Sequence, residues 1–225
     1  MTLDEALAAL KEHVEPGRAE AAAAYHKIPR AYLGVANPPI NDLTKIWRQT
    51  LSVTERVQLA DQLWQTDIYE ARLAAAKVLT QARIKDDEDA WQLIQSWTPD
   101  FDSWAIADHA CMAGHRRLLA NPNRLDQVEA WTRSPHMWTR RAALVVTLPW
   151  TKERHPKPPY LRDRERVLTW AASYVDDPDW FIQKSVAWWL RDLSKRDPAR
   201  VTQFMQDHGA RMKAFARKET VKYLP

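Results

Sequence analysis

Glycine, cysteine and long apolar runs are all scarce in this sequence, and each scarcity excludes a class of protein. Only four of the 225 residues are glycine, too few for the many tight turns of a β-rich fold. The single cysteine, Cys111, cannot form an internal disulfide. No stretch reaches the roughly 20 apolar residues that a membrane-spanning helix needs. The sequence therefore favours an all-α protein that does not span a membrane.

Recognisable metal sites, nucleotide-binding loops and targeting signals are missing as well. The seven histidines and Cys111 do not have the spacing of zinc ligands, and neither a P-loop nor a GxGxxG pattern occurs. The N-terminal segment Met1–Leu10 carries acidic residues where a signal peptide would have basic ones. We therefore expect no metal, no cofactor and a cytoplasmic protein.

The charges are unevenly distributed along the chain. Residues 1–109 hold 11 Lys and Arg against 17 Asp and Glu, whereas residues 110–225 hold 22 against 12. A basic half beside an acidic half indicates a polyanionic partner for the C-terminal part, most simply nucleic acid. A solvated helical surface is the alternative explanation of the charges taken alone.

Apolar residues recur at helical spacing between breaks at proline and polar clusters. This pattern predicts thirteen helical segments, at residues 2–14, 17–28, 39–50, 52–64, 67–83, 87–97, 101–119, 122–133, 135–149, 160–174, 178–194, 197–207 and 210–223. Several segments start with proline after Asn, Asp or Ser, because proline is tolerated in the first turn of a helix behind such a cap.

An internal repeat determines how these helices are expected to be arranged. Residues 134–143 align with residues 177–186 at a separation of 43, and weaker copies lie at 68–75 and 215–221. Each copy places an aromatic or apolar residue, then Arg or Lys, then small residues on the second helix of a pair. Spacings of this size are typical of HEAT-like helical repeats. We predict one HEAT-like repeat domain over residues 1–225, an α-α superhelix with a concave basic cleft.

Two local patterns could carry chemistry. Trp104 and Asp108 are four residues apart, so on a helix they share one face about a turn from each other. Arg141 occupies the basic position of its repeat. Taken alone, the first pair is explained by a packed ring beside a solvated carboxylate, and Arg141 by a structural ion pair.

A third pattern lies on the predicted helix at residues 178–194. Trp188 is four residues beyond Lys184 and therefore shares its helical face, while one of the adjacent Trp188 and Trp189 must point away from the other. Trp188 alone could be a core residue. Twelve tryptophans are nonetheless many for a chain of this size, and Trp is well suited to stacking on nucleobases and sugars.

Six sequence segments resemble the AlkD-type DNA alkylation-repair glycosylases, which are built from HEAT-like repeats. The most specific are FDSWAIAD, MWTRRAA and WFIQKSVAWWLRDLSKRDP, and FARKETVKYL, YHKIPRAYLGVANP and LWQTDIYEARLAAAKVL support them. The resemblance spans roughly residues 20–224, in the family's order. By this resemblance Asp108 matches the catalytic carboxylate, and Trp104 and Trp188 match the two cleft tryptophans. Arg141 matches an arginine that contacts the DNA backbone.

The resemblance implies further DNA contacts. Tyr25 and Lys27 match an N-terminal helix that helps to cover the lesion in that family, in a region where this chain is more divergent. The basic side chains of Lys184, Arg191 and Lys218 are expected to add affinity that does not depend on DNA sequence.

The function implied is that of a monomeric, monofunctional hydrolase in base excision repair. It would cleave the N-glycosidic bond of cationic alkylated purines, such as N3-methyladenine and N7-methylguanine, in double-stranded DNA. Two other classes stay open: a non-catalytic HEAT-repeat scaffold that binds DNA or RNA, and a solenoid that binds partner proteins.

Overall fold

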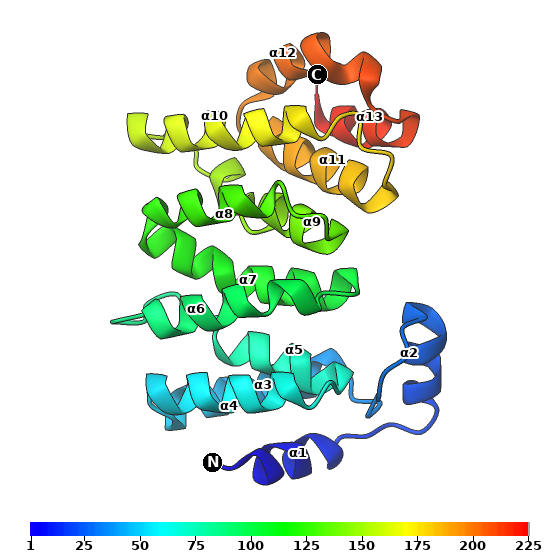
Figure 1. Cartoon of the computed structure of the whole chain (residues 1–225), viewed down its shortest axis with the longest axis vertical. Coiled ribbons are helices and arrows are strands. Elements are labelled where there is room, and N and C mark those ends of the chain that lie inside the picture. Colours follow the sequence, from blue (N-terminus) through cyan, green and yellow to red (C-terminus); the bar gives the residue numbers. More distant parts are fainter. Residues whose placement is uncertain (225) are drawn as a thin grey trace. The chain divides into compact units, whose positions relative to one another are not determined.

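Among the residues that the structure describes, the regular secondary structure is helical apart from one isolated β-bridge between Val14 and Val35. The computed structural model describes residues 1–224, in which thirteen α-helices follow one another without a β-strand (Figure 1). Each predicted helical segment overlaps one of them, with ends that differ by a few residues, and the predicted all-α class is confirmed. No helix among the described residues is both long and apolar enough to cross a membrane. Within residues 1–224, no three His, Cys, Asp or Glu side chains gather as a metal site requires.

The chain divides into two compact units after Ala120. Unit 1 contains α1 (Leu3–Lys11), α2 (Arg18–His26), α3 (Asn37–Thr50), α4 (Val53–Gln65), α5 (Tyr69–Val78), α6 (Glu88–Ser96) and α7 (Trp104–Ala120). Unit 2 contains α8 (Leu125–Trp131), α9 (Met137–Val145), α10 (Pro158–Ser173), α11 (Trp180–Ser194), α12 (Pro198–His208) and α13 (Ala214–Thr220). The single domain predicted over residues 1–225 stays a prediction.

Local sequence explains where several helices begin. Thr2 and Ser52 cap α1 and α4, each in a reciprocal capping box with the glutamate three residues later. Asp197 caps α12 by accepting a hydrogen bond from the Arg200 N–H at 3.0 Å, and Pro198 follows it in the first turn. These helices therefore begin at capping residues and first-turn prolines of the kind that predict a helix start from sequence.

The helices of each unit form two layers. In unit 1, α5 packs between α3 and α7, while α4 contacts α6 in the other layer. In unit 2, α11 packs between α9 and α13, and α8, α10 and α12 pack against them. Helix α2 is the exception, because its axis runs across those of α3 to α7 (Figure 1). We call α3, α5, α7, α9, α11 and α13 the odd helices; they carry the candidate site residues other than those of α2.

Packing accounts for most of the tryptophans. The eight buried ones are Trp47, Trp64, Trp91, Trp97, Trp131, Trp150, Trp170 and Trp189. Trp64 and Trp97, for example, stack with ring centroids 4.3 Å apart. The four that keep solvent exposure all lie on odd helices: Trp104, Trp138, Trp180 and Trp188. The abundance of Trp is therefore mainly a property of the core, and its exposed members are confined to α7, α9 and α11.

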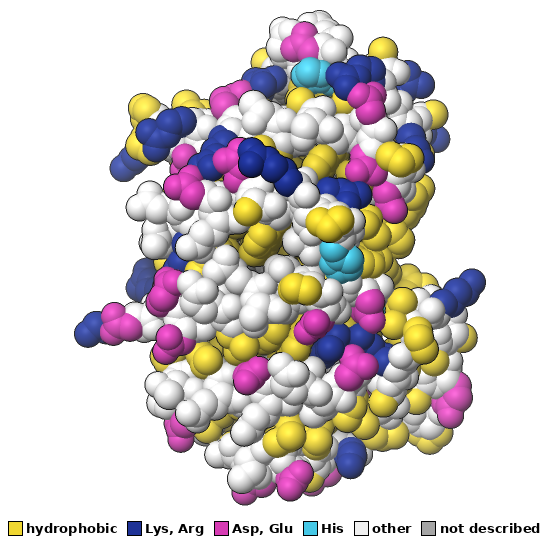
Figure 2. All heavy atoms as spheres, in the orientation of Figure 1, with side chains coloured by type: hydrophobic (Ala, Val, Ile, Leu, Met, Phe, Trp, Pro, Cys, Tyr) yellow, Lys and Arg dark blue, Asp and Glu magenta, His cyan; other side chains and the backbone are white. Residues whose placement is uncertain are grey.

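The two units differ in charge. Unit 1 has 13 Lys and Arg against 17 Asp and Glu, and unit 2 has 20 against 12. On the face drawn in Figure 2, basic and acidic side chains lie beside one another in both units. The predicted concave basic cleft stays a prediction.

Candidate functional site

Trp104 and Asp108 occupy the first two turns of α7. Because α7 begins at Trp104, the two side chains share one helical face about 6 Å apart along the axis. The Trp104 side chain is 38% exposed, whereas Asp108 is only 9% exposed. The two residues thus lie one turn apart on α7, a partly exposed ring and a largely buried carboxylate, and their pairing in a site stays a prediction.

Rings from three other segments gather around Trp104. In α2, Tyr25 meets it edge-on at 6.4 Å between centroids, and His26 lies at 5.9 Å. His26 also contacts Tyr69 of α5 at 4.7 Å and stacks on Tyr32 at 6.3 Å. We call Tyr25, His26, Tyr32, Tyr69 and Trp104 the aromatic cluster. The aromatic cluster thus packs around the first residue of α7, the helix that carries Asp108.

The two α2 residues predicted to cover the lesion have different surroundings. Tyr25 is 69% exposed although its ring contacts Trp104, so its outer face is free to meet a ligand. Lys27 is exposed and ends α2 in the left-handed conformation, with φ at 55°. The structure brings Tyr25 to the aromatic cluster, and the DNA contacts of both residues stay predictions.

His26 is a candidate residue that sequence reasoning missed. Its ring contacts four members of the aromatic cluster, and burial, followed by the nearby positive charge of Arg30, lowers the pKa of its imidazole. The neutral form is therefore favoured at pH 7. It lies in the segment YHKIPRAYLGVANP, but no spacing pattern marked it as a site residue, because its partners Tyr69 and Trp104 are 43 and 78 residues away.

The lowered pKa of His26 predicts a pH dependence of stability. The unfolded chain takes up the proton near pH 6.5, before the folded protein does, so stability is complete above that pH and falls as the pH drops toward the lower folded pKa. His109, whose pKa is also lowered by burial and by Lys77, acts in the same direction. We expect the melting temperature of His26→Phe to fall less than that of the wild type between pH 7.5 and 5. The difference should correspond to the uptake of at most about one proton on unfolding. The exposed His13→Gln is the control, and an unchanged pH profile in His26→Phe would contradict the assignment.

A buried carboxylate attaches the segment after α2 to α5. Glu70, only 1% exposed, accepts backbone hydrogen bonds from Leu33 and Gly34 at 2.8 Å and from Val35 at 3.2 Å. Gly34 has a φ of 85°, and a Cβ there would lie 2.9 Å from the backbone nitrogen of Ala19, so only glycine fits. Glu70 thereby fixes the chain that leads from α2 to α3.

Arg30 provides a second attachment from the same segment. Its guanidinium, 3% exposed, contacts Asp67 at 3.0 Å and Asp102 at 2.5 Å. Asp67 also forms an ion pair with Arg72 of α5 at 3.0 Å. Because Asp102 precedes α7 by two residues, these ion pairs fix α2 relative to the start of α7, where Trp104 stands.

Removing the Glu70 carboxylate should loosen α2. In Glu70→Ala the buried N–H groups of Gly34 and Val35 lose their acceptor, and we expect a loss of about 1–3 kcal/mol in unfolding free energy. Hydrogen exchange at residues 29–36 should rise well above that in Glu20→Ala, an exposed control in α2. Equal protection in both variants would show that Glu70 does not hold this segment.

In unit 2, the predicted basic positions recur at one place in successive odd helices. Arg141, Lys184 and Lys218 are each the fifth residue of α9, α11 and α13. The Arg141 guanidinium, on a residue 4% exposed, lies 5.7 Å from the centroid of Trp138, and the Lys184 ammonium lies 4.6 Å from that of Trp180. Lys218 is exposed. The three residues thus share a position counted from the start of their helices but differ in burial, whereas Arg72 of the remaining copy is the fourth residue of α5.

The remaining site candidates lie further along α11. Trp188 keeps partial exposure while Trp189 is fully buried, as expected for adjacent rings that point apart. Arg191 forms an ion pair with Glu219 of α13. A DNA phosphate would have to compete with that carboxylate, and DNA binding by Arg191 stays a prediction.

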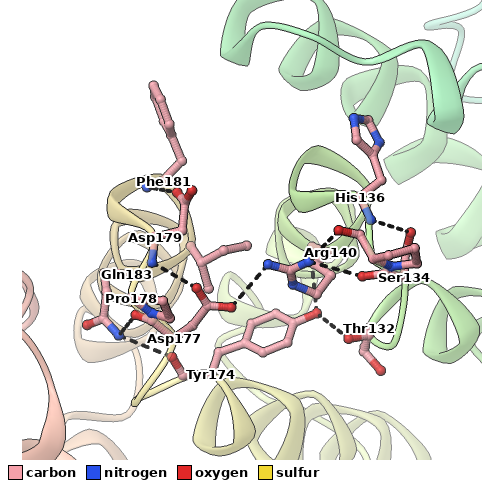
Figure 3. A network of polar contacts seen from close by, with 12 residues as sticks. Thr132, Ser134, His136, Arg140, Tyr174, Asp177, Pro178, Asp179, Phe181 and Gln183 are labelled. Atoms are coloured by element: carbon pink, nitrogen blue, oxygen red, sulfur yellow. Dashed lines mark hydrogen bonds and ion pairs between the residues drawn. The ribbon is translucent and has the colours of Figure 1, made fainter.

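A polar network fixes the starts of α9 and α11 in unit 2 (Figure 3). Arg140 contacts Asp177 at 3.3 Å, and the Tyr174 hydroxyl donates to the carbonyls of Thr132 at 3.2 Å and Arg140 at 3.1 Å. Gln183 donates to the carbonyls of Tyr174, at 3.1 Å, and of Asp177, also at 3.1 Å. Burial raises the pKa of the Tyr174 hydroxyl, which therefore remains a donor. Arg140 is thus a structural residue, distinct from the site candidate that follows it.

The sequence-predicted site draws on both units. Trp104 and Asp108 belong to unit 1, whereas Arg141, Lys184 and Trp188 belong to unit 2. Within its unit, each group lies on the helices predicted for it. That the two groups meet in one cleft stays a prediction.

Comparisons with known proteins give a family through one family model and a shared fold through solved structures. The family model described as "DNA alkylation repair enzyme" matches residues 6–224. Among solved structures, a chain described as a "Predicted DNA alkylation repair enzyme from Enterococcus faecalis" is similar at a TM-score of 0.78 and 22% identity, covering 94% of this chain and 97% of that one. AlkD2 from Streptococcus mutans is similar at a TM-score of 0.66 and 17% identity, covering 99% of each chain. A search of curated proteins gives no match.

Proposed function

This chain belongs to the family of DNA alkylation repair enzymes, and from that premise we propose that it is a DNA glycosylase. Its substrates would be duplexes that carry cationic alkylated purines such as N3-methyladenine or N7-methylguanine. The reaction would be hydrolysis of the N-glycosidic bond by a monofunctional enzyme in base excision repair. We propose further that the protein acts as a monomer in the cytoplasm.

One observation carries this proposal. The fifth residue of α7 is Asp108, whereas the fifth residues of α9, α11 and α13 are Arg141, Lys184 and Lys218. At this position α7 thus has a carboxylate where the three helices of unit 2 have cations, whereas α3 and α5 have the uncharged Asn41 and Leu73. The carboxylate stands one turn from the partly exposed ring of Trp104. A surface that only bound phosphates would gain affinity from a fourth cation at this position. An acid here instead fits a role in chemistry.

The role proposed for Asp108 follows from the chemistry of the lesion. Alkylation at N3 or N7 makes the base cationic, so it leaves without being protonated by the protein. As the glycosidic bond stretches, positive charge moves to the deoxyribose, which gains oxocarbenium character. An ionised Asp108 beside the sugar stabilises that charge and orients a water for attack at the anomeric carbon.

The exposed rings would hold the sugar in place. Trp104 and Trp188 present faces that attract a developing positive charge, an effect that is stronger in the transition state than in the ground state. Tyr25, whose ring contacts Trp104, would cover the same side and limit the access of water. Arg141 would bind a phosphate next to the lesion, and Lys184, Arg191 and Lys218 would add affinity independent of sequence.

The direct test is incubation of the purified protein with methylated duplex DNA, followed by chromatography of the released bases. We expect release of N3-methyladenine and N7-methylguanine well above the spontaneous rate in matched buffer. DNA binding with no release above that rate would favour the non-catalytic scaffold instead. Absence of salt-sensitive DNA binding would point to the solenoid that binds proteins.

A further inference from the structure

Unit 1 contains a basic pocket that none of the roles above uses. Its volume is about 310 Å³, and it is lined by residues of α3, α5 and α7. Lys45 and Arg48 come from α3, Lys77 comes from α5, and His109 comes from α7. These basic residues gather in a unit that is acidic overall.

The positive charges of this pocket are not neutralised by the protein. Arg48 donates to the backbone carbonyl of Lys77 at 2.7 Å, and the Lys77 ammonium donates to the Asn41 side-chain oxygen at 2.7 Å, so both use neutral acceptors. Within residues 1–224, none of the ion pairs formed involves Lys45, Arg48 or Lys77. Asp42 is the single acidic residue of the lining, and it is exposed.

Partly buried cations without a carboxylate are unfavourable unless a ligand supplies the negative charge. Arg30 and Arg117 of unit 1 have such carboxylates, Asp67 and Asp87, whereas the buried Arg56 donates to the neutral oxygens of Ser52 and Gln81. Burial, followed by the charge of Arg48, lowers the pKa of Lys77, and burial also lowers the pKa of Arg48. An anion in the pocket would relieve both effects.

The pocket lies next to the candidate catalytic residue along α7. Met112, which lines it, is four residues beyond Asp108 and therefore shares its helical face about 6 Å further along the axis. Every deoxyribose in a DNA strand carries a phosphate on each side. A sugar held beside Asp108, with its strand running along α7 toward Met112, would bring one of these phosphates to the pocket.

We propose that this pocket binds one phosphate group of the DNA backbone adjacent to the lesion. Arg48 and Lys77 supply the charged donors inside it, and Lys45 adds charge at its rim. The inference rests on the proposed function for the identity of the ligand. A phosphate group could also come from solution, so the test includes inorganic phosphate as a separate probe.

The experiment measures affinity for a fluorescent duplex with an abasic-site analogue at 50 to 200 mM KCl. We expect Arg48→Met and Lys77→Met to weaken binding about tenfold at the lowest salt and to reduce the slope of log affinity against log salt by about one unit. Arg48→Lys and Lys77→Arg should keep the slope. Lys11→Gln, which removes one exposed charge outside the pocket, should keep both the slope and the affinity.

Three results would overturn the inference. The first is wild-type slope and affinity in both methionine variants. In the second, inorganic phosphate raises the melting temperature of the wild type but not that of Lys77→Met, while Lys77→Met binds DNA like the wild type. The pocket would then bind a free anion rather than DNA. If Arg48→Met or Lys77→Met does not fold, Lys45→Met, a change at an exposed residue, is measured instead. The third result is a wild-type slope of log affinity against log salt in Lys45→Met.

Base release distinguishes this inference from the proposed function. Release of methylated bases by the wild type, with unchanged slopes in the pocket variants, refutes the phosphate site alone. Absence of release, with slopes that do change, refutes the glycosylase and leaves a DNA-binding pocket.

Discussion

Asp108→Asn should release alkylated bases at least ~100-fold more slowly than the wild type. The amide has nearly the same shape as the carboxylate but lacks its negative charge, so it can neither stabilise an electron-poor sugar nor accept a proton from water. Single-turnover release from methylated duplex DNA, with the protein in excess, measures the chemical step without product dissociation.

Binding provides the control for this variant. Asp108→Asn should bind the same duplex at least as tightly as the wild type, because removing a negative charge does not weaken attraction to phosphates. Asp61→Asn, on the exposed face of α4, makes the same chemical change outside the site and should keep the wild-type rate. Base release by Asp108→Asn at that rate would remove the carboxylate from the mechanism.

Trp189→Ala should lower the free energy of unfolding by about 3–5 kcal/mol, whereas its neighbour Trp188→Ala should lower it by roughly 1 kcal/mol. Trp189 is completely buried in unit 2, and truncating it leaves a cavity. Trp188 is partly exposed, so its loss should instead reduce base release. Urea denaturation and single-turnover release, run on both variants, separate the two roles.

Trp189→Phe refines this comparison. The indole nitrogen of Trp189 has no hydrogen-bond partner within the described residues, so phenylalanine loses volume but no polar contact. It should recover most of the stability that alanine loses. If Trp188→Ala proved the less stable of the two alanine variants, the assignment of one ring to the core and the other to the site would be wrong.

The sequence predicts where each helix lies because that depends on local signals. It predicts the exact helix ends less well because contacts with distant residues determine where a helix stops. The segment predicted at 67–83 becomes α5, which ends at Val78. The carbonyls of Gln81 and Ala82, instead of continuing the helix, accept hydrogen bonds from Arg117 of α7. Likewise α9 stops at Val145 rather than at residue 149, and a short 3-10 turn that contains Pro149 follows it.

The same distinction applies to the candidate site. The shared face of Trp104 and Asp108, and the repeated position of Arg141 and Lys184, depend on spacing within one helix or one repeat, so the sequence was sufficient to find them. The contacts of His26 with the aromatic cluster depend on tertiary packing across tens of residues. No local sequence motif predicts contacts between residues so far apart in the chain.

The distribution of tryptophans has an optical consequence. Eight indoles are shielded from solvent and will dominate the intrinsic fluorescence of the protein. An aqueous quencher such as iodide can quench only the four tryptophans that keep solvent exposure. The strongest quenching is expected for Trp104 and Trp180, whose exposed fractions are 38% and 45%. A bound oligonucleotide that covers either ring would therefore register as a loss of iodide sensitivity rather than as a large change in total intensity.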